Sequence, residues 1–217
     1  MDILGILADK LEFVRRFYKT ASGPFVDVKA KIEAAEEPFN FEGPPREEPP
    51  FLREWVDAVE SLNILGQLCL CLVQRSFKEF LVGFVKNTGR EPPREGQNWF
   101  ATYRSFYLRE YDIDWRGAPV DISFLEELTL ARNSILHSGT GHDIYRLAHA
   151  QSRDYYARFP QGLFTSEIDQ SLWSGMGQNQ PARIEVTEEK LELAIRSVDE
   201  FCSYLDRVFR ERAWRAL

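Results

Sequence analysis

The segment LNILGQLCLCLV, residues 62–73, decides the fold, because it is apolar on almost every side of a helix. It lies within residues 51–87, a stretch without proline in which apolar residues recur at helical spacing. Asn63, Gln67 and Gln74 interrupt it well before the ~20 apolar residues that a bilayer requires. The segment therefore predicts the central helix of a soluble bundle and no membrane span.

The same periodicity recurs on both sides of this segment and predicts that the rest of the chain is helical. We expect further helices over residues 3–19, 25–37, 99–111 and 123–137, and a long last helix that Thr187 caps. Ser22-Gly23-Pro24 should separate the first two, since proline disrupts a helix interior. Ser123 and Glu126 have capping-box spacing, which predicts that Ser123 caps the fourth.

Two segments of the chain lack a long helical pattern. Residues 38–50 are rich in proline and predict a surface loop. Residues 140–186 predict an insertion with a short helix over 144–159 and two paired strands within 162–173 and 183–186. Residues 1–217 therefore predict one all-α domain, an up-and-down helical bundle with a small irregular β-hairpin insertion before the last helix.

Composition limits the partners and the compartment of this protein. The formal net charge of −7 argues against a surface coated with positive charge for non-specific nucleic-acid binding, although it leaves room for a local basic site. Three cysteines without zinc-type spacing, and no secretory leader, favour a cytoplasmic location. The aromatic helix over 99–111 also carries Arg104 and Arg109, a mixture that fits either core packing or the stacking of bases.

Residues 130–139, LARNSILHSG, carry the polar pattern that stands out from this scaffold. On a helical wheel, Glu126, Thr129, Asn133 and His137 form a polar ladder beside the core face. Asn133 and His137 are one turn apart, so we expect the Asn133 amide to contact the His137 imidazole. Arg132 falls inside the apolar arc, where a guanidinium needs an acidic partner, a ligand phosphate or a facing subunit, unless its head reaches water. The three residues Arg132, Asn133 and His137 are our candidate catalytic residues.

Arg132-Asn133-Ser134-Ile135-Leu136-His137 resembles the signature of HEPN-domain ribonucleases, in which an arginine and a polar residue precede a histidine by one turn. The setting is similar too, with a capped amphipathic helix late in an all-helical chain and a long last helix. Some members of that family carry a tyrosine two residues after the histidine, which a partner enzyme modifies. Gly139 stands there in this chain, which puts that form of toxin–antitoxin control in doubt.

The resemblance implies a metal-independent endoribonuclease without a cofactor, in which two copies supply two histidines and two arginines at a homodimer cleft. The residue types suit this chemistry, because histidine exchanges protons near neutral pH and arginine binds phosphate oxygens while staying charged. Cleavage by the 2′-OH should leave a 2′,3′-cyclic phosphate and a 5′-OH. RNA and a possible inhibitory or regulatory protein are the expected partners, and antiviral defence or a toxin–antitoxin system is the expected setting.

Three alternatives remain open on the sequence. A HEPN-like module without catalytic activity would dimerise and bind RNA, a nucleotide or a protein. A purely structural bundle would pair Arg132 with Glu126, Glu127 or Asp121. A metal site at His137 and His142 would need ligands beyond Asp143, the only one nearby, so we expect no metal.

Overall fold

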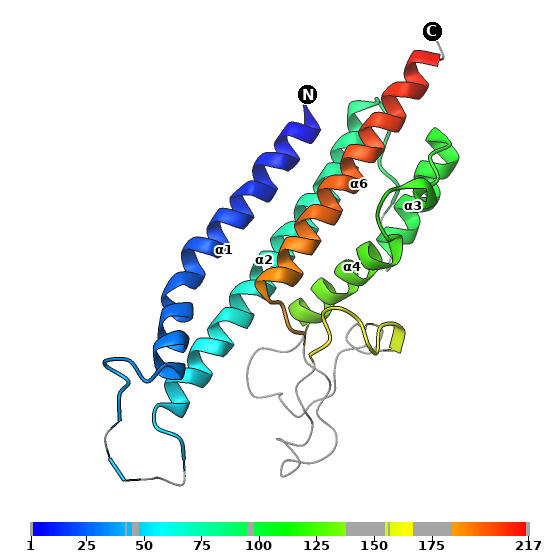
Figure 1. Cartoon of the computed structure of the whole chain (residues 1–217). Helices are drawn as coiled ribbons and strands as arrows, with labels where there is room; N and C mark the ends of the chain where they lie inside the picture. Colours follow the sequence, from blue (N-terminus) through cyan, green and yellow to red (C-terminus); the bar gives the residue numbers. More distant parts are fainter. Residues whose placement is uncertain are drawn as a thin grey trace.

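The computed structural model describes residues 2–41, 43–44, 48–94, 98–137, 155, 157–166 and 184–215. Its helices are α1 (Ile3–Glu33), α2 (Leu52–Asn87), α3 (Trp99–Tyr111), the short 3-10 helix η1 (Trp115–Gly117), α4 (Ile122–His137) and α6 (Glu188–Arg215). The long helices α1, α2 and α6 lie side by side, with α3 and α4 on the other side of α2 and α6 from α1 (Figure 1). The chain thus forms the predicted all-α bundle, and both termini lie at the same end.

Helix α1 corrects the prediction of two helices separated at Ser22-Gly23-Pro24. It is continuous through Pro24 and ends at Glu33. Pro24 and Gly23 are exposed, so the proline ring meets solvent and not a neighbouring helix. The buried stripe of α1 faces α2 and α6, and we infer that this packing outweighs the hydrogen bond lost at Pro24. That stripe consists of Leu7, Leu11, Val14, Tyr18 and Ser22.

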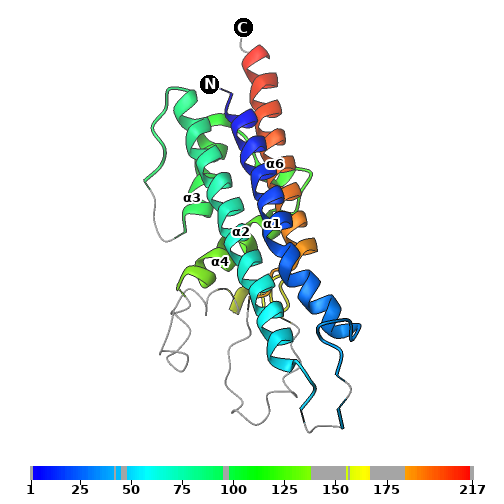
Figure 2. The same cartoon turned by 90° about the vertical axis from the view of Figure 1, so that its left-hand side faces the viewer.

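Helix α2 confirms the prediction for residues 51–87 almost to the residue and forms the centre of the core. Among the described helices it alone is long and apolar enough to cross a membrane by length and composition. It packs instead against α1, α4 and α6, as Figure 2 shows from the side of α1. Gln74 is buried within it, and Asn63 and Gln67 bind backbone atoms near Ile184. These contacts identify α2 as a core helix of the bundle.

The aromatic residues of α3 are core residues, as one of the two predicted readings required. Trp99, Phe100, Tyr103, Phe106 and Tyr107 are all buried. Trp115 of η1 is fully buried too, and its ring meets Phe100 and Phe201 edge to face at centroid distances of 5.3 and 5.0 Å. Trp115 therefore joins Phe100 of α3 to Phe201 of α6, and the rings of α3 belong to the core.

The ends of two helices test the predicted caps. The capping role assigned to Ser123 was wrong, because α4 begins at Ile122 and the carboxylate of Asp121 accepts from the Ser123 backbone N–H at 2.8 Å. Thr187 does precede α6, and its hydroxyl oxygen accepts from the backbone N–H of Lys190 at 3.4 Å, as predicted. The carboxylate of Asp121, directly before the helix, thus replaces the predicted capping box at α4.

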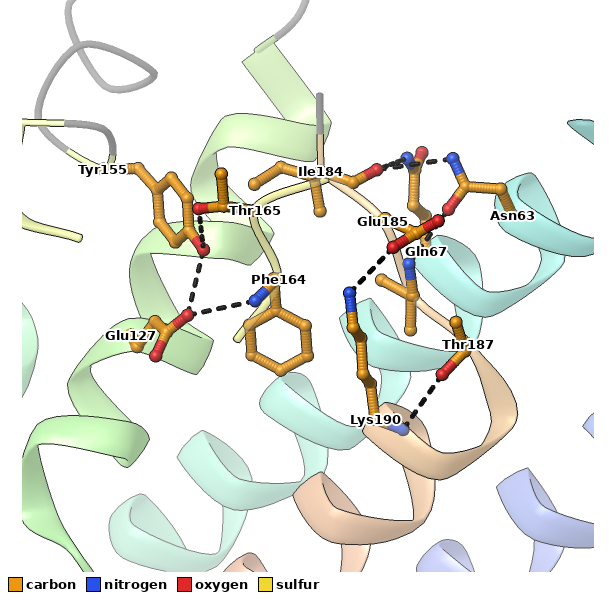
Figure 3. Close-up of polar contacts among 11 residues, drawn as sticks. Asn63, Gln67, Glu127, Tyr155, Phe164, Thr165, Ile184, Glu185, Thr187 and Lys190 are labelled. Atoms are coloured by element: carbon orange, nitrogen blue, oxygen red, sulfur yellow. Dashed lines mark hydrogen bonds and ion pairs between the residues drawn. The ribbon is translucent and has the colours of Figure 1, made fainter. Parts of the chain in front are cut away.

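The described parts of the insertion are attached to the bundle by polar contacts (Figure 3). The described residues show one antiparallel bridge, Thr165 with Ile184, where the sequence predicted paired strands. The amides of Asn63 and Gln67 both donate to the Ile184 carbonyl, and Asn63 Oδ1 accepts from the Val186 backbone N–H. Residues 144–154 and 167–183 lie outside the described residues, so most of the predicted short helix and hairpin is untested.

Candidate functional site

Helix α4 has a buried core face with polar residues beside it. Leu125, Leu128 and Ala131 are fully buried in the core. Arg132 and Asn133 follow directly and are only half-buried. The backbone of His137 forms the last residue of α4, and its side chain lies outside the described residues. The structure therefore places all three candidate residues in the last two turns of one helix.

Arg132 is not ion-paired to any of the carboxylates that a purely structural role predicted. Glu126 pairs with Arg158 at 2.8 Å. Glu127 accepts from two other groups, described below, and Asp121 caps its own helix. Among the described residues, Arg132 donates from Nη1 to Asn133 Oδ1 at 3.0 Å and has no carboxylate partner. Within the described part of the chain, its charge is thus not neutralised by an ion pair.

The neighbourhood of Arg132 includes Cys71 of α2. Burial raises the pKa of the Cys71 thiol, and the nearby positive charge of Arg132 opposes that shift. Arg132 therefore lies at the boundary between α4 and α2, half inside the protein. This position fits the prediction that its stem covers apolar surface, with a guanidinium that reaches the outside.

Asn133 contacts Arg132 within α4. The expected contact between the Asn133 amide and the His137 imidazole lies outside the described residues. Its amide oxygen accepts from Arg132, which leaves the amide N–H groups without an acceptor among the described residues. Asn133 therefore holds Arg132 in position and still has donors that face a cavity.

A cavity of about 560 Å³ opens between α4, the start of α3 and residues 157–158. Its polar lining consists of Asn98, Glu126, Thr129, Asn133 and Arg158. Three of these, Glu126, Thr129 and Asn133, belong to the polar ladder that the sequence placed beside the core face. The ladder is therefore one wall of a cavity that adjoins Arg132.

Two consecutive carboxylates hold the wall of this cavity in place. Glu127 is buried, and its Oε1 accepts from the Tyr155 hydroxyl at 2.9 Å and from the Phe164 backbone N–H at 3.1 Å (Figure 3). Glu126, on the neighbouring side of the helix, binds Arg158. Tyr155 and Arg158 are one helical turn apart, so both carboxylates fix the same short segment against α4.

The sequence did not identify Asn98 or Arg158 as site residues. Each comes from an element distant in sequence from α4, and neither belongs to a recognisable motif. The polar ladder was the only sequence feature that pointed to this cavity, because polar side chains beside a buried face need polar partners or water. His142 and Asp143, which the alternative metal site would use, lie outside the described residues.

Comparisons of this chain with protein-family models, with curated proteins and with solved structures found no match.

Proposed function

We propose that this protein is a metal-independent endoribonuclease in which Arg132, Asn133 and His137 act on the scissile phosphate. The observation that carries the proposal is the state of Arg132. It is half-buried, lies five residues before His137 on the same helix, bonds to Asn133 and is not paired with a described carboxylate. An arginine so placed suits an anionic ligand, because its planar fork binds two phosphate oxygens.

The proposed reaction moves two protons and exchanges one P–O bond for another. A general base takes the proton of the 2′-OH, and the 2′-oxygen attacks the adjacent phosphorus. The bond from phosphorus to the 5′-oxygen breaks, and a general acid protonates that oxygen. His137 supplies proton transfer, and Arg132 stabilises the negative charge that builds on the phosphorane oxygens. The products are a 2′,3′-cyclic phosphate and a 5′-OH.

A second copy of the chain supplies the second histidine in this proposal, and an exposed apolar face supports such pairing. On α1 the face contains Phe13, which is 56% exposed, and Phe17, whose ring stacks on that of Phe13. On α2 it contains Leu68, which is 54% exposed, one turn from Ile64 and from Leu72. The pair of Lys10 with Glu79 aligns the two helices, so both rows lie on the same side of the hairpin.

The size and the position of this face favour a second copy as its occupant. Side chains of this size, about half exposed, leave on the order of 500 Å² of apolar surface, close to the largest patches on ordinary monomers. Two copies would bury ~1,000 Å², with rim residues adding toward the ~1,200 Å² of a specific interface. Leu68 lies on α2, against which α4 packs, so a two-fold contact at this face would use the helix next to the one that carries Arg132.

A HEPN-like module that binds RNA, a nucleotide or a regulatory protein without cutting is the second candidate. The formal net charge of −7 favours it. So does the pairing of arginines with carboxylates around the site and elsewhere, as in Arg158 with Glu126 and Arg15 with Glu192. A surface that is negative overall, with its arginines paired, attracts RNA weakly. The nuclease proposal requires only one cation at the site.

Incubation of the purified protein with mixed RNA in EDTA separates the two candidates. The nuclease gives fragments that end in 2′,3′-cyclic phosphate, and Arg132→Ala greatly slows their formation. The binding module gives a complex without fragments. A cleavage that requires added metal, or one that leaves a 5′-phosphate, contradicts the proposed chemistry.

A further inference from the structure

The cavity beside Asn133 offers a site whose ligand can be inferred from its lining. It measures about 560 Å³, within the range of roughly 300–1,000 Å³ typical of small-molecule sites. That space accommodates a nucleoside and is far larger than an ion requires. Trp99, Phe100 and Leu130 form its apolar part. The polar side chains of Asn98, Glu126, Asn133 and Arg158 also line it.

The polar atoms that face the cavity are both donors and acceptors. Glu126 is largely buried, with 16% of its side chain exposed, and only its Oε2 binds Arg158. Each carboxylate oxygen has two lone pairs, so both can accept further bonds while Arg158 stays in place. Asn98 uses its Oδ1 to cap α3, and Asn133 uses its Oδ1 to hold Arg132, so both amides retain N–H donors.

This lining excludes two classes of ligand. A bare phosphate would meet the Glu126 carboxylate, and the one cation on the cavity, Arg158, is already paired with it. A purely apolar ligand would leave the carboxylate and two amides without partners, which is costly in a confined site. A flat heteroaromatic group with donors on one edge and acceptors beside them fits both parts of the lining.

We propose that this cavity binds the base of a guanosine next to the cleaved bond, an inference that rests on the proposed ribonuclease function. Guanine alone among the four RNA bases presents two adjacent N–H donors on its Watson–Crick edge, at N1 and N2, which a carboxylate accepts together. The neighbouring O6 accepts from the Asn133 or Asn98 amide. Adenine and cytosine would turn a ring-nitrogen lone pair toward Glu126, and uracil would turn a carbonyl oxygen toward it.

The position of the cavity fits a base adjacent to the reacting phosphate. Asn133 lines the cavity and also binds Arg132, so one side chain joins the base site to the cation. Arg158, more than half exposed, keeps N–H donors that can reach the backbone of the same nucleotide. Single-stranded RNA would thus be held by one base and by the phosphate next to it.

Base preference can be measured by binding, without any cleavage. The full-length protein is titrated with fluorescent 2′-fluoro pentanucleotides, which lack a 2′-OH, of sequence UUGUU, UUAUU, UUCUU and UUUUU. We expect UUGUU to bind about tenfold more tightly than the others, the discrimination typical of a bidentate contact to a base. Equal affinities for the four sequences would overturn the proposal.

Two carboxylate-to-amide variants test whether Glu126 sets the preference for guanine. Glu126→Gln should reduce it below about threefold, because one acceptor becomes a donor that opposes guanine. Glu110→Gln is the matched control, since Glu110 is another half-buried carboxylate with arginine partners, on α3 away from the cavity. A preference that survives Glu126→Gln contradicts the proposal. If Glu126→Gln does not fold, Asn98→Asp keeps the cap of α3 and should weaken UUGUU binding selectively.

The outcomes separate this inference from the proposed function. If the protein cleaves RNA but binds the four pentanucleotides equally, the nuclease proposal is supported and the guanosine site is contradicted. Guanine-selective binding that depends on Glu126, in a protein that cuts no RNA, removes the nuclease and leaves a base-binding module.

Discussion

The two halves of α4 are built in opposite ways. In the first half, Glu126 and Glu127 are matched to partners from the 155–165 segment, with three hydrogen bonds between 2.8 and 3.1 Å. In the second half, Arg132 and Asn133 bond to one another, and Arg132 has no carboxylate partner among the described residues. The first half attaches a segment of the protein, and of its two carboxylates only Glu126 also lines the cavity. The second half leaves charge and donors for something outside the protein.

This difference indicates where substitutions should affect folding and where they should affect function. Loss of a satisfied buried group removes stability, because its partner is left unpaired. Loss of a half-buried arginine without a carboxylate partner should remove little stability and should affect only ligand chemistry. The experiments below test that division, beginning with the largest expected effect.

Arg132→Ala should reduce RNA cleavage by about 10²–10³-fold, the usual cost of removing one group that stabilises transition-state charge. Its melting temperature should stay within a few degrees of the wild type. Arg196→Ala, an exposed arginine of α6, is the control and should cut normally. Single-turnover rates with a labelled RNA measure the effect, and an Arg132→Ala protein that cuts at the wild-type rate would remove the arginine from the mechanism.

Leu68→Glu should weaken dimerisation by about 100-fold or more, because the carboxylate would be buried in an apolar interface. Leu108→Glu is the matched control, since Leu108 is a comparably exposed leucine of α3 outside the α1–α2 face. Sedimentation across a range of concentrations measures both. A wild-type protein that stays monomeric throughout, or a Leu68→Glu dimer as stable as the wild type, would show that this face does not join two copies.

Glu127→Ala should lower the free energy of unfolding by about 1–3 kcal/mol, because the buried Phe164 N–H and the Tyr155 hydroxyl both lose their hydrogen bond to Glu127. Glu127→Gln, which keeps an amide oxygen in place, should cost less. Urea denaturation measures both variants. An equal loss in the two would mean that the negative charge of Glu127, and not its acceptor, holds the segment.

Glu79→Gln should change stability by less than about 1 kcal/mol, because the ion pairs of Glu79 with Lys10 and Arg75 are exposed. Those hydrogen bonds lower the pKa of Glu79. A lowered carboxyl pKa adds stability that is complete at neutral pH and is lost as the pH falls through the folded-state value. The variant should therefore differ from the wild type at pH 7 and converge with it near pH 3. Urea titrations at both values check this, and a difference that grows in acid would contradict it.

Much of the fold followed from periodicity, and its errors have local causes. The stripes of α2 and α6 predicted their helices well, because each stripe is continuous and buried. Pro24 misled the reading of α1, since the tertiary packing that holds a helix across a proline is not visible locally. The start of α4 was misplaced because Asp121 and Ser123 are both good caps two residues apart.

The sequence singled out the candidate residues but did not predict their contacts. The motif singled out Arg132, Asn133 and His137, because all three lie within six consecutive residues of one helix and can be recognised from the local sequence. The choice of Asn133 as the partner of Arg132 depends on side-chain rotamers, which no spacing rule fixes. Arg158 and Asn98 were missed because folding brings them to α4 from distant parts of the chain.

The most direct test of the central claim is cleavage of one RNA by the wild type and by His137→Ala, in EDTA, with end-group analysis. We predict wild-type fragments that end in 2′,3′-cyclic phosphate, a rate at least 10²-fold lower for a folded His137→Ala protein, and no cleavage of the same RNA with every 2′-OH methylated. Equal cleavage of the methylated RNA, or a His137→Ala enzyme as fast as the wild type, would contradict the account.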